Sequence, residues 1–247
     1  MNKKSNELYG LFTVFLLWYI IYFAVNSMSV PSPHVTLMNL MNIFDGESLI
    51  LHVGYSLYRI IVSVGLALVV GSAIGITLGL NKRVDKVFLP GIYVLFPIPK
   101  AAFLPAIFAV FGLGDGSKIF LIFVIVVFQI IITTRDAVKN LSEEVFVSAM
   151  SIGMSKKDIL RHIVVPSILP SIFSSVRVTV GIALAVLFFS ETYATSYGIG
   201  YFIINKWSMI EYVDMYGGIV VLSFMGYLLF RVIDRCEGHY CKWNGGS

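Results

Sequence analysis

Long apolar runs alternate with short polar loops along most of the chain. About 20 apolar residues, rising 1.5 Å each in a helix, cross a hydrocarbon core of about 30 Å. The pattern therefore predicts an all-α polytopic membrane protein, with a six-span core at residues 8–233 between tails at 1–7 and 234–247. We expect a single domain over 1–247. The predicted spans are 8–25, 57–80, 87–111, 119–133, 168–189 and 217–233.

The second predicted span carries a stripe of small residues. Ala67, Gly71, Gly75 and Gly79 recur at every fourth position, so they share one face of a helix. Small residues at this spacing allow another helix to approach closely within a membrane. Glycine is common in membrane helices in general, but four small residues in register favour a packing face.

The third predicted span cannot be one straight helix, because proline interrupts helical hydrogen bonding. Lys100 follows the break near the middle of the run, and an ionisable residue at that depth is a functional-site hypothesis. The alternative is a structural lysine that pairs with a carboxylate such as Glu191 or reaches a backbone carbonyl. The prolines of this run are Pro90, Pro97, Pro99 and Pro105.

Composition supports the membrane assignment, and the charges orient the chain. The sequence is 57% hydrophobic and 13% charged, against roughly 45–50% apolar and 25% charged in soluble domains. The net charge of +4 is dispersed among the loops, which argues against nucleic acid as a partner. With a cytoplasmic N-terminus, thirteen lysines and arginines lie on the cytoplasmic side and only Lys118 and Lys206 lie opposite, as the positive-inside rule requires. Both termini and the loop 142–166 are thus expected in the cytoplasm.

No catalytic or metal-binding pattern accompanies the spans. Cys236, His239 and Cys241 supply three potential ligands, whereas a closed zinc site normally has four. The sequence contains no Walker A, HExxH or GxSxG motif. A membrane-embedded enzyme would need convergent polar residues at one depth, and few ionisable residues lie in the spans. We therefore expect no catalysis, metal or cofactor in this chain.

The longest polar interruption, residues 142–170, has the pattern of two short helices. A helix over 144–152 would place Val145, Ala149 and Ile152 on one face. A glycine then permits the backbone to reverse, and a serine followed three residues later by an aspartate predicts an acidic capping box for the second helix. These turn residues are Gly153, Ser155 and Asp158, and prolines at Pro166 and Pro170 mark the return to the membrane.

This stretch resembles the cytoplasmic "EAA" loop of ABC importer permeases, and motifs elsewhere resemble the nitrate/sulfonate/taurine branch of that family. The resemblance covers about residues 56–233. In the loop it rests on Ala149-x-x-x-Gly153, Ile159-Leu160, Val165-Pro166 and Leu169-Pro170. Outside the loop it rests on Phe96-Pro97-Ile98-Pro99-Lys100, Leu104-Pro105, Phe111-Gly112-Leu113-Gly114, Ser117-Lys118-Ile119, Arg177, Gly181, Glu191 and Tyr197-Gly198-Ile199-Gly200-Tyr201.

The resemblance implies a fold like that of type I ABC importer permeases, with loop 142–166 as a coupling helix seated in a groove of a separate ATPase. Val147 stands where the family usually has a glutamate, so either Glu143 or Glu144 substitutes or the coupling is more apolar. The expected coupling residues are Val147, Ser148, Ala149, Ile152, Gly153, Ser155 and Asp158. The expected residues of the translocation pathway are Lys100, Arg177 and Glu191.

The resemblance also implies partners and cargo. The expected partners are two ATPase subunits, a second permease copy forming a homodimer, an extracytoplasmic solute-binding protein and the lipid bilayer of a prokaryotic inner membrane. The expected cargo is a small anionic or zwitterionic solute, and the alternative is a heterocycle of the thiamine-precursor type. Two other hypotheses remain: a secondary carrier or channel without an ATPase, and a loop that is only an amphipathic hairpin on the membrane surface.

Overall fold

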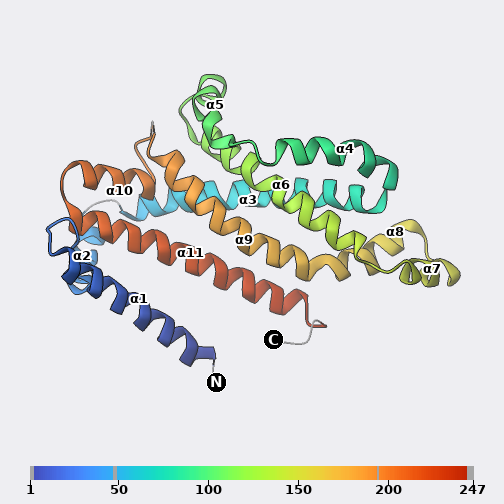
Figure 1. The fold of residues 1–247 in the computed structure, drawn as a ribbon, viewed down its shortest axis with the longest axis horizontal. Coiled ribbons are helices and arrows are strands. Elements are labelled where there is room, and N and C mark those ends of the chain that lie inside the picture. The colour runs from blue at the N-terminus through green and yellow to red at the C-terminus, as the bar shows by residue number, and fades with distance from the viewer. Residues whose placement is uncertain (1–2, 47–48, 194, 244–247) are drawn as a thin grey trace. The chain divides into compact units, whose positions relative to one another are not determined.

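The computed structural model describes residues 3–46, 49–193 and 195–243, and every regular element in these residues is helical (Figure 1). The expected all-α class is confirmed. The elements are α1 (Lys3–Val25), α2 (Pro33–Gly46), α3 (Leu49–Leu80), α4 (Lys82–Leu95), the 3-10 turn η1 (Lys100–Phe103), α5 (Leu104–Phe111), α6 (Asp115–Lys139), α7 (Glu143–Ser151), α8 (Lys156–Ile159), the π-helical turn η2 (Leu160–Val164), α9 (Val165–Glu191), α10 (Ile199–Ser208) and α11 (Tyr212–Tyr240).

The chain divides into two compact units. Unit 1 contains residues 1–56 and 191–224, and unit 2 contains residues 57–190 and 225–247. The boundaries fall inside α3 and α11 and at the last residue of α9. The loop 142–166 and the broken third span therefore belong to unit 2.

Five helices among the described residues are long and apolar enough to cross a membrane. A sixth span results if α4 and α5 count as one broken crossing, because the chain bends by 75° between Lys82–Leu95 and Lys100–Phe111. Five of the six predicted runs each correspond to one of these helices. The third predicted run corresponds to the bent pair, so the expected break in it is confirmed. The five helices are Leu8–Val25, Leu49–Leu80, Asp115–Lys139, Lys156–Glu191 and Tyr212–Tyr240.

In unit 2, α3 packs closely on α6 through the predicted glycine stripe. A methyl group on Gly75 would lie 2.7 Å from the carbonyl oxygen of Ile131 and 2.7 Å from Cβ of Thr134. Gly71 and Gly79 approach side chains of α6 in the same way. Because only glycine leaves room for such an approach, the stripe is confirmed as a packing face.

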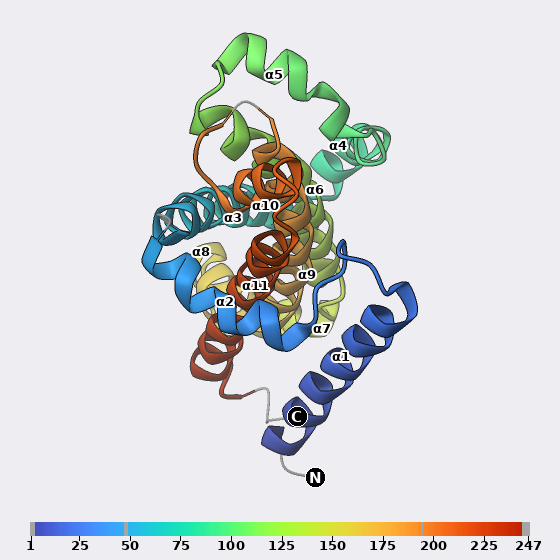
Figure 2. The same cartoon turned by 90° about the vertical axis from the view of Figure 1, so that its left-hand side faces the viewer.

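In unit 1, the two N-terminal helices pack against the start of α11. Figure 2 shows α1 and α2 joined by a short loop, and Trp18 Nε1 donates to the carbonyl of Pro31 in that loop at 3.1 Å. The Trp18 ring stacks on Tyr216 with centroids 5.7 Å apart. At Gly217, an added methyl group would lie 3.0 Å from Cδ1 of Ile43 in α2.

Candidate coupling and translocation sites

Helices α7 and α8 form a hairpin whose turn depends on a glycine. Gly153 follows α7 with a φ of +82°. The N–H groups of Gly153 and Met154 donate to the carbonyls of Met150 and Ala149 at 3.0 and 3.1 Å. This pair of bonds is a Schellman motif, in which glycine is the usual residue because it lacks the Cβ that clashes at positive φ. The expected reversal at this glycine is confirmed.

The capping box expected at the start of α8 is also confirmed. The Asp158 N–H donates to the Ser155 hydroxyl at 3.3 Å, and the Ser155 N–H donates to the Asp158 carboxylate at 3.3 Å. The Ser155 hydroxyl also donates to that carboxylate at 2.5 Å.

The second helix of the hairpin continues into α9 through a single π-helical turn. The Val165 N–H donates to the carbonyl of Leu160, five residues earlier. Pro166 has no N–H to offer the carbonyl four residues before it, which accounts for the wider turn at this point. Pro166 and Pro170 therefore lie within one continuous helix, Lys156–Glu191.

One side of the hairpin is buried in a hydrophobic cluster of unit 2. Ala149 and Ile159 are 3% and 8% exposed, and Phe146 and Met154 are partly buried against the same cluster. Burying these side chains anchors the hairpin to the ends of α6 and α9. The buried members of the cluster are Val138, Ala149, Ile159, Val164 and Ile168.

The three residues expected to share one face of α7 have different surroundings. Ala149 is 3% exposed, whereas Val145 and Ile152 are 40% and 78% exposed. The inward face is instead formed by Phe146 and Ala149, which lie three residues apart. In a helix this short, spacings of three and four fit more than one face, so the neighbouring helices decide which face is buried.

Outside the buried cluster, the surface of α7 and of the turn after it carries exposed apolar side chains. Val147, Met150 and Ile152 are 58%, 59% and 78% exposed. Of the two glutamates that open the helix, Glu143 forms an exposed ion pair with Lys82 at 3.3 Å. Ser148 is also exposed, so a partner could reach the whole of this side.

Lys100 lies at the break between α4 and α5 and caps the broken helix end. Its Nζ donates to the carbonyls of Leu95 and Phe96 at 3.0 and 2.9 Å. Pro99 has no N–H for the Leu95 carbonyl four residues earlier, and the ammonium occupies that place. The same Nζ lies 4.6 Å from the centre of the Phe128 ring. Lys100 thus reaches backbone carbonyls, one of the two partners expected for a structural lysine, and it lines an apolar cavity of about 490 Å³.

Arg177 forms an ion-paired group with two carboxylates of α11. Its Nε donates to Asp234 at 2.8 Å, and its Nη2 donates to Glu237. All three side chains are partly buried or half-exposed, at 32%, 40% and 23%. The positive charge of Arg177 is therefore offset by two negative charges within unit 2.

Glu191 is fully buried and organises the glycine-rich turn before α10. Its carboxylate accepts from the Ser56 hydroxyl at 2.8 and 2.9 Å and from the Gly200 N–H at 2.9 Å. The Ile199 N–H donates to Ser56 Oγ at 2.8 Å. Gly198 approaches so closely that an added methyl group would lie 2.4 Å from the carboxyl carbon. This turn is thus built around one carboxylate.

Sequence reasoning missed the partners of Glu191. Ser56 lies 135 positions away along the chain, and His52, whose Nδ1 accepts from the Gly198 N–H at 3.0 Å, is similarly remote. Neither residue belongs to a recognisable motif, and no local pattern marks them. Lys100, Arg177 and Glu191 each bind a different set of partners and do not contact one another in the bonds described above. Their shared role in a pathway therefore stays a prediction.

Known proteins are similar to this chain in sequence and in fold. The taurine transport system permease protein of Escherichia coli K12 is 26% identical over 226 residues, which cover 90% of this chain and 82% of that protein. A putative ABC transporter permease of Methanocaldococcus jannaschii is 30% identical over 234 residues, covering 92% and 88%. The inward-facing MetNI methionine ABC transporter has a chain of the same fold, with a TM-score of 0.66 at 18% identity over 78% of this chain and 95% of that one.

A family model also matches most of the chain. The family described as the binding-protein-dependent transport system inner membrane component matches residues 67–238, which include the broken span, the hairpin and the Glu191 turn. It describes a multi-pass inner-membrane protein without catalytic activity, working with an ATPase and a binding protein. On this evidence the chain belongs to the inner membrane components of binding-protein-dependent transport systems, the permease subunits of ABC importers.

Proposed function

We propose that this permease forms the pathway for a small anionic or zwitterionic solute and takes its energy from an ATPase that binds the exposed side of α7. In this arrangement the termini and the hairpin 142–166 are cytoplasmic, and two permease copies assemble with two ATPase subunits. The positive-inside count of the loops supports the orientation. The whole of 1–247 then acts as one permease domain.

The observation that carries the proposal is the exposed apolar surface of α7. Val147, Met150 and Ile152 are more than half exposed. The helix is held in place by Ala149, which packs in the buried cluster with residues of α6 and α9. Apolar side chains gathered on an otherwise polar loop mark an interaction site. Because the hairpin is fixed by the Gly153 turn and the Ser155–Asp158 box, its position can follow that of α6 and α9 as a rigid element.

The same surface bears on the missing family glutamate. Val147 occupies that position and is 58% exposed, so it is placed to contact a partner by apolar packing. Glu143 is engaged with Lys82, although an ion pair with both side chains 88% exposed contributes little. We propose that the coupling contact is mainly apolar and that Glu144, which is exposed on the first turn of α7, supplies the carboxylate.

The test is co-purification of the permease with its ATPase after substitution of Ile152. Ile152→Asp places a charge where an apolar contact is proposed, and Ile152→Leu keeps the contact. We expect Ile152→Asp to lower both ATPase recovery and ATP-driven uptake in proteoliposomes at least about tenfold, and Ile152→Leu to leave both near wild type. If Ile152→Asp binds the ATPase and transports normally, the coupling assignment is wrong. If the charged variant only releases the hairpin from lipid, ATPase recovery is unchanged and the proposal also fails.

Cargo is proposed from similarity and from charge. The taurine permease of Escherichia coli is named for a zwitterionic sulfonate, and Lys100 places a cation at the broken span beside an apolar cavity. The experiment is calorimetry on the solute-binding protein encoded beside the permease gene, with taurine, an alkyl sulfonate, nitrate and an aminopyrimidine as ligands. Tight binding of the pyrimidine alone would favour the heterocycle alternative over the sulfonate class.

A further inference from the structure

The turn between α10 and α11 has a backbone that glycine usually adopts, but it holds an isoleucine. Ile210 has a φ of +64°. Its N–H donates to the Trp207 carbonyl at 3.1 Å, and the Glu211 N–H donates to the Lys206 carbonyl at 3.0 Å. These bonds form a Schellman motif with Ile210 at the left-handed position. A β-branched residue at positive φ is a genuine outlier, because its Cβ is crowded by the backbone there.

Three other helices among the described residues are followed by a residue at positive φ, and all three use a residue that tolerates it. Gly112 follows α5 with a φ of +75°. Gly153 follows α7, and Asn26, with a φ of +43°, follows α1. At the α7 turn the flanking Met154 and Ala149 pack together in a buried cluster, as is common in this motif. At the Ile210 turn an ion pair takes that place, since Lys206 Nζ lies 2.7 Å from Glu211 Oε2.

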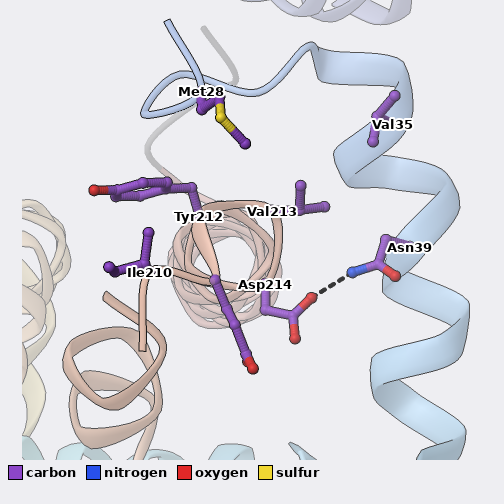
Figure 3. Close-up of a pocket in the computed structure, with 8 residues that line it drawn as sticks. Met28, Val35, Asn39, Ile210, Tyr212, Val213 and Asp214 are labelled. Atoms are coloured by element: carbon purple, nitrogen blue, oxygen red, sulfur yellow. Dashed lines mark hydrogen bonds between the residues drawn. The ribbon is translucent and has the colours of Figure 1, made fainter. Parts of the chain in front are cut away.

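The strained isoleucine is not held by packing within its own unit. Its side chain is 72% exposed and lies on the rim of a pocket of about 480 Å³ (Figure 3). Met28 and Val35, on the other side of the pocket, are 91% and 42% exposed. Strained backbone conformations are concentrated at functional sites, and here the strained residue also has an exposed side chain. We therefore consider what this pocket would fit.

The charged residues that line the pocket are Glu211 and Asp214, and hydrogen bonds or ion pairs hold both carboxylates in place. Asp214 Oδ1 accepts from Asn39 Nδ2 at 2.5 Å, as Figure 3 shows, and its other oxygen lies 3.2 Å from Lys206 Nζ. Lys206 is only 4% exposed, whereas Glu211 is 47% exposed. One buried cation thus faces two carboxylates, which gives the rim a net charge of −1. An apolar pocket with an exposed carboxylate fits a segment that presents an apolar side chain beside a lysine or arginine.

We propose that the Ile210 surface, formed by Met28, Val35, Ile210, Glu211 and Asp214, is a docking site for the solute-binding protein. This inference rests on the proposed orientation, which places the loop 26–32 and the turn 209–211 outside the cytoplasm. Ile210 is the apolar anchor, and its strained turn fixes the direction in which it projects. Glu211 attracts the basic residue of the partner, so binding weakens as salt screens the pair.

The test compares two substitutions that suit the backbone of Ile210 with a neighbouring control. Ile210→Gly and Ile210→Asn both tolerate positive φ but remove the apolar anchor. Met209→Ala removes an exposed side chain that does not line the pocket. The permease–ATPase complex is reconstituted in nanodiscs, and the binding protein encoded beside the permease gene is titrated onto it. The readouts are the Kd for the binding protein, its stimulation of ATP hydrolysis and the melting temperature of the complex.

We expect both Ile210 variants to raise the Kd at least about tenfold, and Met209→Ala to leave it unchanged. Ile210→Gly should keep or raise the melting temperature, because it relieves the strained φ, so weaker docking cannot be attributed to unfolding. An unchanged Kd in both Ile210 variants overturns the inference. So does a change confined to the number of permease copies or to lipid association, which would assign the surface to a second copy or to the bilayer.

The result also separates this inference from the proposed function. If the wild-type complex responds to the binding protein and the Ile210 variants respond equally, only the docking site is wrong. If the wild-type complex itself neither binds that protein nor increases ATP hydrolysis, the proposed importer function fails together with the docking site.

Discussion

Gly75→Ala should separate α3 from α6 and destabilise unit 2. The added methyl group would lie 2.7 Å from the Ile131 carbonyl oxygen, about 0.7 Å short of the 3.4 Å at which ordinary contact begins. A backbone carbonyl inside a helix cannot rotate away, so the helices themselves must shift. Overpacking of this kind costs about 1–3 kcal/mol, against a gain of roughly 0.5–1 kcal/mol for replacing glycine by alanine in a helix. We expect a net loss of about 1–2 kcal/mol.

The matched control for this substitution lies on the same helix. Gly65→Ala adds a methyl group with nothing within 4 Å, so it should be neutral or stabilising. In detergent, thermal unfolding followed by size-exclusion chromatography should show a melting temperature for Gly75→Ala lower by roughly 2–8 °C, and no decrease for Gly65→Ala. Equal melting temperatures for the two variants would show that the close approach of α3 and α6 does not exist in the folded protein.

Two further substitutions test the polar groups that fix the fold. Asp85→Ala removes the carboxylate that accepts from Arg135 at 2.6 and 2.8 Å and from Lys139. The nearly buried Arg135 would keep only the half-exposed Asp136 as a partner, so we expect a loss of about 3 kcal/mol, and a melting curve like that of wild type would contradict this. Gly198→Ala combines a φ of +133° with a clash against the Glu191 carboxylate; we expect a loss of at least about 2 kcal/mol and poor recovery of monodisperse protein, whereas Gly54→Ala, with nothing within 4 Å, should purify normally.

Features set by local chemistry could be predicted from the sequence. The spans follow from the length of apolar runs, and the break follows from prolines that remove helical donors. The turn at Gly153 and the capping box at Ser155 and Asp158 could also be predicted, because each depends on residues within five positions of one another. The glycine stripe predicted a close helix contact, although the sequence did not name α6 as its partner.

Features set by tertiary contacts could not be predicted. The donors to Glu191 come from Ser56 and from a turn that the same carboxylate organises, so no local pattern reveals them. The inward face of α7 could not be predicted for a related reason, because α6 and α9 decide which apolar residues are covered. The left-handed turn at Ile210 was invisible because isoleucine gives no sign of positive φ.

The partners of Arg177 and Lys100 bear on which of these two residues could attract an anionic cargo. Arg177 faces both Asp234 and Glu237, so this group carries a net charge of −1 and does not attract an anion. Lys100 donates to the backbone carbonyls of Leu95 and Phe96, and its side chain lines an apolar cavity. If the cargo is anionic, as proposed above, it would meet a positive charge at the proline break, where the Lys100 Nζ lies. Of the three residues predicted to line the pathway, Lys100 is thus the best candidate for contact with such a cargo.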